Sequence, residues 1–365
     1  MDQMELKEGF RLDGIPHNRE SLVHFCRDMW NRPGIAEWRK ELCLFMLNWF
    51  DPAVPVIEQQ TSGSTGKPRS HHFSREAMAR SAQNTLSHFS LQTGERILLC
   101  LPVRYIAGKM MVVRAMVGGL DLVTVEPSGR PMAGWEGNVS FAAMVPLQVH
   151  ESVHHGDDLS PVGILLIGGG EIHPTMRQRL AGMECPAIYE SFATTETCTH
   201  FALRRINGTD PDILFKPMHG VTVSQDHRGC LVVNVEGVTG GPVTTNDLVE
   251  IEPHGKEFKW LGRVDHVINS GGIKIIPEIL EQKIRGALGL DCLVLPEKDA
   301  RLGNRLILVI ESEESDPPGE QWLQSLREVL PPYEVPRRIL TIPHIPRNPS
   351  FKPDRKETLR LVRIS

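Results

Sequence analysis

The stretch QTSGSTGKPR, residues 60–69, combines four hydroxyl side chains, two glycines and a lysine directly after the apolar run at 54–57. Glycines permit backbone conformations that present successive N–H groups to an anion, and a lysine adds a point charge suited to phosphate. A Walker loop needs Gly-x4-Gly-Lys-[Ser/Thr]. Here two residues separate Gly63 from Gly66, and Pro68 takes the place of the hydroxyl. The spacing therefore indicates a phosphate loop of another type; the alternative is a polar turn between a strand and a helix.

The composition is that of an ordinary globular protein. The chain has 365 residues, 40% hydrophobic and 23% charged, enough for a large core and a second domain. Lysine and arginine total 40 against 45 acidic residues, a net charge of −5 that excludes a global cationic surface for nucleic acid. Seven dispersed cysteines favour reduced thiols. Without an apolar signal core or a membrane-length apolar run, we expect a cytoplasmic protein with no membrane span.

Short apolar runs alternate with amphipathic segments from residue 53 onward, a pattern typical of a layered α/β core. Helical spacing occurs over 20–50 and 75–89, with Ser74 as an N-cap, and later over 277–288 and 319–329. We expect strands at 55–60, 96–101, 120–125, 139–145, 163–167, 186–190, 291–295, 305–311 and 338–342. Residues 212–262 are β-rich, and a polar tail ends the chain. The sequence thus predicts a large α/β domain followed by a small α+β domain.

Three further stretches carry candidate site residues. Gly168–Glu171 (GGGE) follows an expected strand, where ligands bind open α/β sheets, although it is equally a strand-ending turn. Residues 191–197 (SFATTET) place a hydroxyl beside a carboxylate, a pair suited to phosphate and Mg²⁺; the alternative is a helix N-cap with an acidic first turn. In residues 244–247 (TTND), Asp247 can accept hydrogen bonds from ribose hydroxyls, or the segment is a simple turn.

Two longer stretches complete the series, WLGRVDHVINSGGIKIIP at 260–277 and PRNPSFKPDR at 346–355. Together with residues 60–69, 191–197 and 244–247, and in the same order, they resemble the signature motifs of the adenylate-forming superfamily of acyl-CoA synthetases, luciferases and peptide-synthetase adenylation domains. Departures from the family pattern are Phe192 for Tyr, Ala193, Asn246 and Phe351 for Gly, and Ile279 for Glu. The last has no interpretation from sequence.

The resemblance implies a set of nucleotide-binding residues. A clamp on the β- and γ-phosphates would comprise Thr61, Ser62, Gly63, Ser64, Thr65, Gly66 and Lys67. The adenine would lie along Gly168, Gly169, Gly170 and Glu171, with Phe192 flanking the nucleotide. Asp247 would bind the ribose, Arg263 the ribose or phosphate, and Gly271 and Gly272 would line the route of the thiol.

The same resemblance implies the catalytic residues and the domain limits. Lys352 would bridge the carboxylate and the α-phosphate, Thr195 would contact phosphate, and Glu196 would hold Mg²⁺. A hinge at 263–266, around Asp265, would join a large domain over 1–262 to a small mobile domain over 267–365. The phosphate loop begins earlier than is usual in the family, so we expect a large domain trimmed at its N-terminus.

The substrate is indicated by two segments. LPVRYIAGK at 101–109 resembles the family's Leu-Pro-x-x-His-x-x-Gly segment beside the acyl pocket, with Tyr105 at the His position. Together with TETCTH at 195–200, it makes the chain most similar to the o-succinylbenzoate–CoA ligases of bacterial menaquinone synthesis. That acid has a second carboxylate, so cations are expected in its pocket. The candidate substrate residues are Tyr105, Lys109, Arg114 and His200, although each cation is equally an ordinary surface or helix residue.

The implied reaction has two steps. A small carboxylic acid reacts with Mg·ATP to give acyl-AMP and pyrophosphate, and coenzyme A then displaces AMP to give the thioester. Alternatives are a ligase for another aryl or fatty acid, an enzyme that loads a carrier-protein thiol, and an inactive nucleotide-binding relative. A homo-oligomer is compatible with the sequence.

Overall fold

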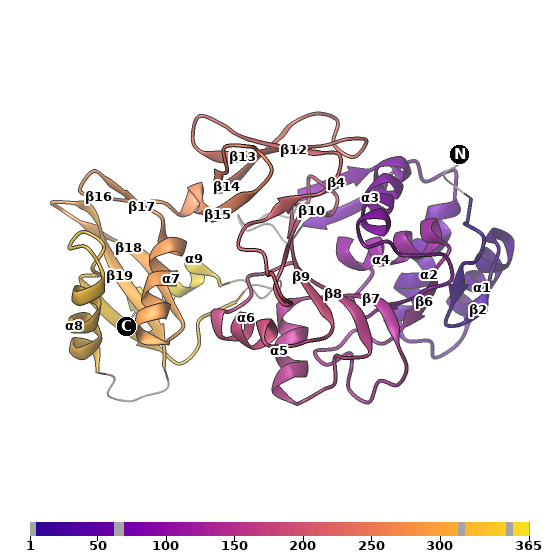
Figure 1. Ribbon diagram of the computed structural model, residues 1–365, viewed down its shortest axis with the longest axis horizontal. Coiled ribbons are helices and arrows are strands. Elements are labelled where there is room, and N and C mark those ends of the chain that lie inside the picture. The colour runs from indigo at the N-terminus through magenta and orange to yellow at the C-terminus, as the bar shows by residue number, and fades with distance from the viewer. Residues whose placement is uncertain (1–4, 62–68, 313–317, 348–352, 365) are drawn as a thin grey trace. The chain divides into compact units, whose positions relative to one another are not determined.

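The computed structural model describes residues 5–61, 69–312, 318–347 and 353–364 (Figure 1). The predicted site residues Ser62, Gly63, Ser64, Thr65, Gly66, Lys67 and Lys352 lie outside the described residues. The chain divides into two compact units. The first comprises Met1–Val223 and Val233–Val243, and the second Ser224–Val232 and Thr244–Ser365.

The first unit is built on a nine-stranded sheet in the order β11-β10-β9-β8-β7-β5-β6-β1-β2. The strands are β1 (Arg11–Leu12), β2 (Ile15–Pro16), β5 (Arg96–Leu99), β6 (Asp121–Thr124), β7 (Val139–Met144), β8 (Val162–Ile167), β9 (Ala187–Ala193), β10 (His200–Arg205) and β11 (Lys216–Pro217). Neighbours from β9 to β1 run parallel, whereas β10, β11 and β2 pair antiparallel at the edges. Parallel strands are buried on both faces, which accounts for their continuous apolar runs. The predicted α/β core is confirmed.

Six helices of this unit are described: α1 (Arg19–Asn31), α2 (Glu37–Phe50), α3 (Arg75–His88), α4 (Ile106–Gly118), α5 (Pro146–His154) and α6 (Pro174–Ala181). The expected cap of α3 is present, since Ser74 Oγ accepts from the Ala77 N–H at 3.1 Å. The alternation of strands and helices predicts a helix between the strands at 96–101 and 120–125, where α4 lies, but no bounds for it were predicted. Because most of its residues are buried, it lacks the polar face that produces an amphipathic period.

The expected strand at 55–60 is present as β3 (Ile57–Thr61) but does not belong to the large sheet. Within the described residues it pairs only with β4 (Arg69–Phe73), antiparallel, with Thr61 opposite Arg69. The polar stretch therefore joins two strands of a hairpin. The alternative of a turn between a strand and a helix is wrong.

Residues 221–263 form a four-stranded sheet in the order β12 (Val221–Gln225), β13 (Cys230–Val235), β14 (Val243–Ile251) and β15 (Phe258–Arg263). This confirms the β-rich segment.

Beyond residue 263, the second unit has a three-stranded sheet, a hairpin and three described helices. The sheet is β18 (Cys292–Asp299), β19 (Gly303–Glu311) and β20 (Arg338–Ile342), the hairpin is β16 (Ile268–Ser270) and β17 (Ile273–Ile275), and the helices are α7 (Pro277–Leu288), α8 (Gly319–Val329) and α9 (Arg355–Ile364). Both expected helices are confirmed, but the polar tail is wrong, because α9 buries Val362 against β18, β19 and β20 residues. The charges of α9 obscure this apolar stripe in the sequence.

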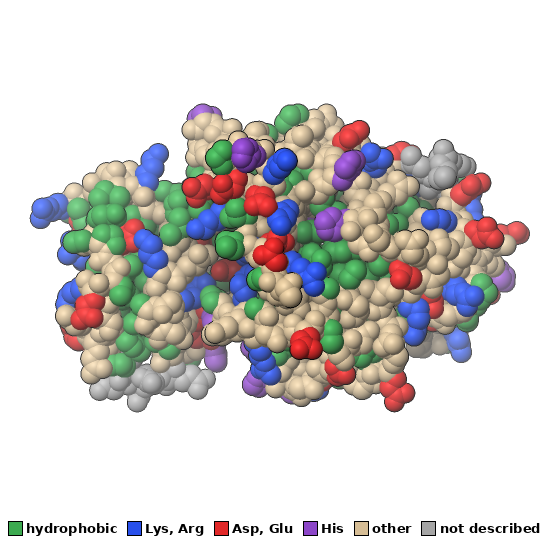
Figure 2. Space-filling model, viewed as in Figure 1, with side chains coloured by type: hydrophobic (Ala, Val, Ile, Leu, Met, Phe, Trp, Pro, Cys, Tyr) green, Lys and Arg blue, Asp and Glu red, His purple; other side chains and the backbone are tan. Residues whose placement is uncertain are grey.

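On the face shown in Figure 2, acidic and basic side chains are interspersed, as the small net charge leads one to expect. Across the described parts of the chain, no helix has the length and apolar character needed to cross a membrane. All seven cysteines are free thiols, and six of them are buried.

Candidate active site

The glycine turn after β8 is shaped by the neighbouring strand. A Cβ on Gly168 would lie 2.2 Å from Ser191 Oγ, closer than real contacts, and Gly169 has φ +84°. Ser191 in turn donates a hydrogen bond to the Ile167 carbonyl at 3.1 Å. A side chain at 168 would therefore displace the Ser191 hydroxyl from this hydrogen bond. The turn thus lies beside the strand that carries the next predicted motif.

The segment SFATTET crosses from β9 to β10. Thr194 and Thr197 hydrogen bond to each other at 3.2 Å, and the Thr195 carbonyl accepts from the Cys198 N–H at 3.0 Å. Cys198 has φ +66°, which closes the turn. This tight turn excludes the helix N-cap alternative. It leaves the carboxylate of Glu196 exposed, as a ligand for a cation arriving with a nucleotide must be.

Phe192 stands at the end of β9 in an aromatic cluster. Its ring meets those of Phe201 and Phe215 edge to face, with centroids 5.6 and 5.1 Å away. The adjacent Glu190, which the sequence did not single out, accepts from Arg204 Nε at 2.6 Å and also from Arg177. Arg177 belongs to α6 and Arg204 to β10, so Glu190 links both elements to β9.

In the second unit, Asp247 and Arg263 face each other across β14 and β15. Trp260 Nε1 donates to Asp247 Oδ1 at 3.1 Å, and Arg263 Nη1 is 3.9 Å from the same oxygen. Arg263 also donates two bonds to Asp265, at 3.0 and 3.2 Å. Partial burial alone would raise the pKa of Asp265, but these bonds hold it below its ordinary value. The predicted ribose ligand and the predicted hinge residue therefore share one arginine.

Gly271 and Gly272 form the two-residue turn between β16 and β17. Their φ angles are +58° and +87°, and such hairpin turns require positive φ at both central residues. The Gly271 N–H donates to the Leu302 carbonyl at 2.9 Å. The glycines have a structural reason here, whether or not a thiol passes them.

The four predicted substrate residues form two groups, one at the N-terminal end of α4 and one inside the first unit. Tyr105 lies at its N-terminus, 46% exposed. Lys109 Nζ donates to Gln59 Oε1 at 2.7 Å and to the Arg104 carbonyl at 3.3 Å. Burial lowers the pKa of Lys109, although Glu41 and Glu58 act against this. The lysine is thus engaged with β3 and the segment before α4.

Arg114 and His200 come together inside the first unit. Arg114 Nη2 donates to Thr199 Oγ1 at 3.3 Å, and the same hydroxyl is 3.3 Å from His200 Nδ1. The other ring nitrogen of His200 is 3.3 Å from Thr85 Oγ1 on α3. Arg114 is 2% exposed and His200 7%. The sequence missed Thr85 and Thr199, because nothing in the spacing relates α3 to the β9–β10 turn.

The charge of Arg114 is uncompensated within the described residues. No carboxylate pairs with its guanidinium there, and its Nε is buried without a hydrogen-bond partner. Its remaining contacts are Met111 Sδ at 3.5 Å and the Phe141 ring, 5.9 Å from Cζ. Burial lowers its pKa to about 10, so it stays protonated at neutral pH. Burial, then Arg114 and His88, push the pKa of His200 well below its ordinary value, which keeps the imidazole neutral.

Arg355, the last residue of the 346–355 motif, pairs with carboxylates of α7. Arg355 donates to both oxygens of Glu281 at 2.7 and 2.8 Å, and more weakly to Glu278 Oε1 at 3.4 Å. Glu278 also meets His266 Nδ1 at 2.5 Å. Ile279, the unexplained departure, is only partly buried, and Glu278 one position earlier carries the buried carboxylate. The spacing of the motif cannot show that the buried carboxylate is at 278 and not at 279, since only packing shows which position faces inward.

Comparison with known proteins gives consistent results. The model of the AMP-binding enzyme family matches residues 21–243. The 2-succinylbenzoate–CoA ligase of Salmonella typhimurium is 24% identical over 339 residues, 87% of this chain and 71% of that protein. The crystal structure of an AMP-forming acyl-CoA synthetase/AMP-acid ligase II-like protein from Dyadobacter fermentans is 32% identical, with TM-score 0.61, covering 93% of this chain and 98% of that one.

A third similarity concerns the fold alone. The o-succinylbenzoate coenzyme A synthetase of Bacillus subtilis, solved in complex with ATP and a magnesium ion, has TM-score 0.67 and 18% identity, covering 83% of this chain and 69% of that one.

These matches show that the chain belongs to the AMP-binding enzyme family. Its class is that of the adenylate-forming CoA ligases, the AMP-forming acyl-CoA synthetases.

Proposed function

We propose that this enzyme activates a small acid with a second carboxylate, o-succinylbenzoate, and transfers it to coenzyme A. The observation that carries the proposal is the buried, uncompensated guanidinium of Arg114 beside His200 and Thr199. A buried charge without a counterion is costly, and an anionic substrate removes that cost on binding. A neutral fatty acyl chain gives no such compensation. The relatives named 2-succinylbenzoate–CoA ligase support the same substrate.

We propose a nucleotide-binding role for each predicted motif. Thr61 to Lys67 would hold the β- and γ-phosphates, the turn at Gly168–Glu171 the adenine, and Asp247 and Arg263 the ribose. Glu196 and Thr195 fit a magnesium-bound phosphate, because Mg²⁺ is held by one or two carboxylates together with phosphate oxygens and water. The ion would neutralise phosphate charge during attack by the carboxylate.

Residues 267–365 would supply Lys352 for adenylation and then turn about 263–266 to admit the thiol past Gly271 and Gly272. We propose 1–262 and 267–365 as the domains that this hinge joins. A mobile cation stabilises charge that develops on an in-line phosphoryl centre.

Pyrophosphate release with a panel of acids tests the substrate. We expect release with o-succinylbenzoate, followed by thioester formation when coenzyme A is added. Release with fatty acids but not with o-succinylbenzoate would refute the substrate. Adenylation without transfer to coenzyme A would favour a carrier-protein thiol as acceptor.

Lys352→Ala tests the lysine. Removing one donor at a developing charge costs roughly 10²–10³-fold in rate, so pyrophosphate release should fall by about that factor. Thioester formation from supplied acyl-adenylate should be far less affected. The matched control is Lys356→Ala, which removes an exposed cation from α9. Equal losses in both half-reactions would contradict the assigned role.

A further inference from the structure

A cavity of about 380 Å³ lies against the outer face of α3, in the first unit. Its lining consists of Arg80, Gln83, Asn84, Ser87, His88 and His219. All six side chains are polar, five of them come from one helix, and none is acidic. No motif in the sequence drew attention to these positions.

The donors around this cavity are available to a ligand. Within the described residues, no ion pair or side-chain hydrogen bond engages Arg80, Gln83, Asn84 or His219. The stem of Arg80 packs over Gly237, where an added Cβ would lie 3.2 Å from Arg80 Cγ. This contact fixes the root of the side chain while its charged end stays exposed. A guanidinium with several amide and imidazole donors suits a carboxylate.

The cavity is linked to the buried cation described above. Thr85, which lies on α3 one helical turn before His88, contacts His200, and His200 shares Thr199 with Arg114. Since Arg114 is buried, its charge reaches a ligand in the cavity as a field through this chain of polar groups.

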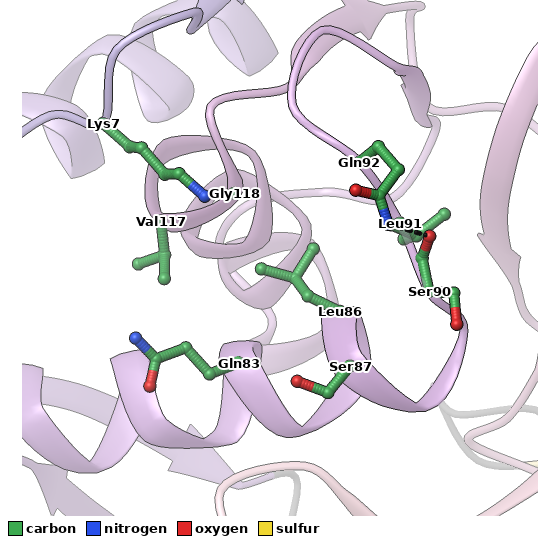
Figure 3. Close-up of a pocket in the computed structure, with 9 residues that line it drawn as sticks. All are labelled: Lys7, Gln83, Leu86, Ser87, Ser90, Leu91, Gln92, Val117 and Gly118. Carbon is green, nitrogen blue, oxygen red and sulfur yellow. Dashed lines mark hydrogen bonds between the residues drawn. The ribbon is translucent and has the colours of Figure 1, made fainter.

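A second pocket of about 360 Å³ provides a contrast (Figure 3). It shares Gln83 and Ser87 with the first but is otherwise lined by Leu86, Leu91, Val117 and Gly118, with Lys7 and two polar residues, Ser90 and Gln92. It lies where α3 meets the C-terminal end of α4, and the Gln92 amide there is already bonded to the Ser90 carbonyl. The histidines and the arginine belong to the first cavity alone.

We infer that the cavity over α3 binds the second carboxylate of the acid, and that Arg80 and Asn84 are specificity-determining residues that contact it, with Arg114 acting behind them. The inference rests on the proposed function, since it assumes that the acid is a dicarboxylate.

Calorimetric binding to the full chain, with Mg²⁺ and a non-hydrolysable ATP analogue, tests this inference. The probes are o-succinylbenzoate and its analogue without the ring carboxylate. Arg80→Met keeps the stem over Gly237, and Asn84→Leu removes the amide. A hydrogen bond to a charged group contributes enough for a roughly 10–100-fold change. We therefore expect each variant to weaken the diacid by about that factor, leaving the monoacid and the nucleotide unaffected.

Arg27→Met on α1 is the matched control, because it removes an exposed cation elsewhere in the same unit. It should leave both affinities unchanged. The inference would be overturned if the cavity variants weakened binding of both acids equally, or if they left the ratio of the two dissociation constants unchanged. It would also be overturned if the wild type bound the diacid no more tightly than the monoacid. Failure of the proposed function would instead appear as absent pyrophosphate release with o-succinylbenzoate, whatever the binding ratio.

Discussion

Two arginines, one in each unit, have opposite surroundings. In the second unit, Arg355 meets Glu281 through two hydrogen bonds and Glu278 through a third. In the first unit, Arg114 has only a hydroxyl, a thioether and an aromatic ring among the described residues. A compensated cluster serves the fold, because its charges satisfy each other. An uncompensated buried cation is stabilised only when an anion arrives, so it serves a ligand.

Breaking the compensated cluster should have the largest effect. Arg355→Met removes both hydrogen bonds to the buried Glu281 and leaves Arg285 Nη2, at 3.6 Å, as its remaining cation. Losing one partner of a buried charge costs up to about 3–5 kcal/mol. We expect urea denaturation followed by a probe in the second unit to show this decrease in unfolding free energy. Arg360→Met, which removes an exposed partner of Glu357 on the same helix, should leave it unchanged. Equal stability of Arg355→Met and wild type would remove the contrast between the units.

Removing the uncompensated cation should lower activity without lowering stability. Arg114→Met relieves the burial of a charge, so the unfolding free energy should stay the same or rise. The catalytic efficiency kcat/KM for the diacid should fall by less than the roughly 10–100-fold expected for Arg80→Met, because Arg114 acts on the acid through its field and not through a hydrogen bond. Denaturation and pyrophosphate release measured on the same preparation check both parts. A loss of stability with unchanged kcat/KM would assign Arg114 to the fold.

The smallest effect concerns His200 and pH. Its folded-state pKa lies below the unfolded value of 6.5, so the unfolded chain binds the extra proton first. The contribution of the neutral His200 to the unfolding free energy is complete above pH 6.5. As the pH falls below 6.5, the unfolding free energy decreases by up to about 1.4 kcal/mol per pH unit.

His88 and His17 also have pKa values lowered by burial, so the comparison needs a variant. His200→Gln should flatten the pH dependence of the unfolding free energy between pH 5 and about 6.5 relative to wild type. Identical slopes would show that His200 is not the titrating group.

Much of the fold can be predicted from local signals in the sequence. Helix α7 spans 277–288 as predicted, with Pro277 at its start and Gly289 as its C-cap, and Ser74 caps α3. Failures occurred where tertiary context overrides the local pattern. Helix α4 is apolar on nearly every side, and α9 looks like a solvated tail until Val362 is packed. Of the predicted substrate residues, the structure joins Arg114 with His200 and places Lys109 with Gln59.

The class of enzyme can be predicted from the sequence, because the order and spacing of the motifs reflect chemical requirements at fixed positions along the chain. Which charges are compensated depends on the folded structure. Arg114, Thr199 and Thr85 come from a helix, a turn and another helix, and their proximity depends on packing across the sheet. Packing also determines that the buried carboxylate belongs to Glu278 and not to position 279. Burial turns an ordinary arginine into a binding group, and burial is a property of the folded chain.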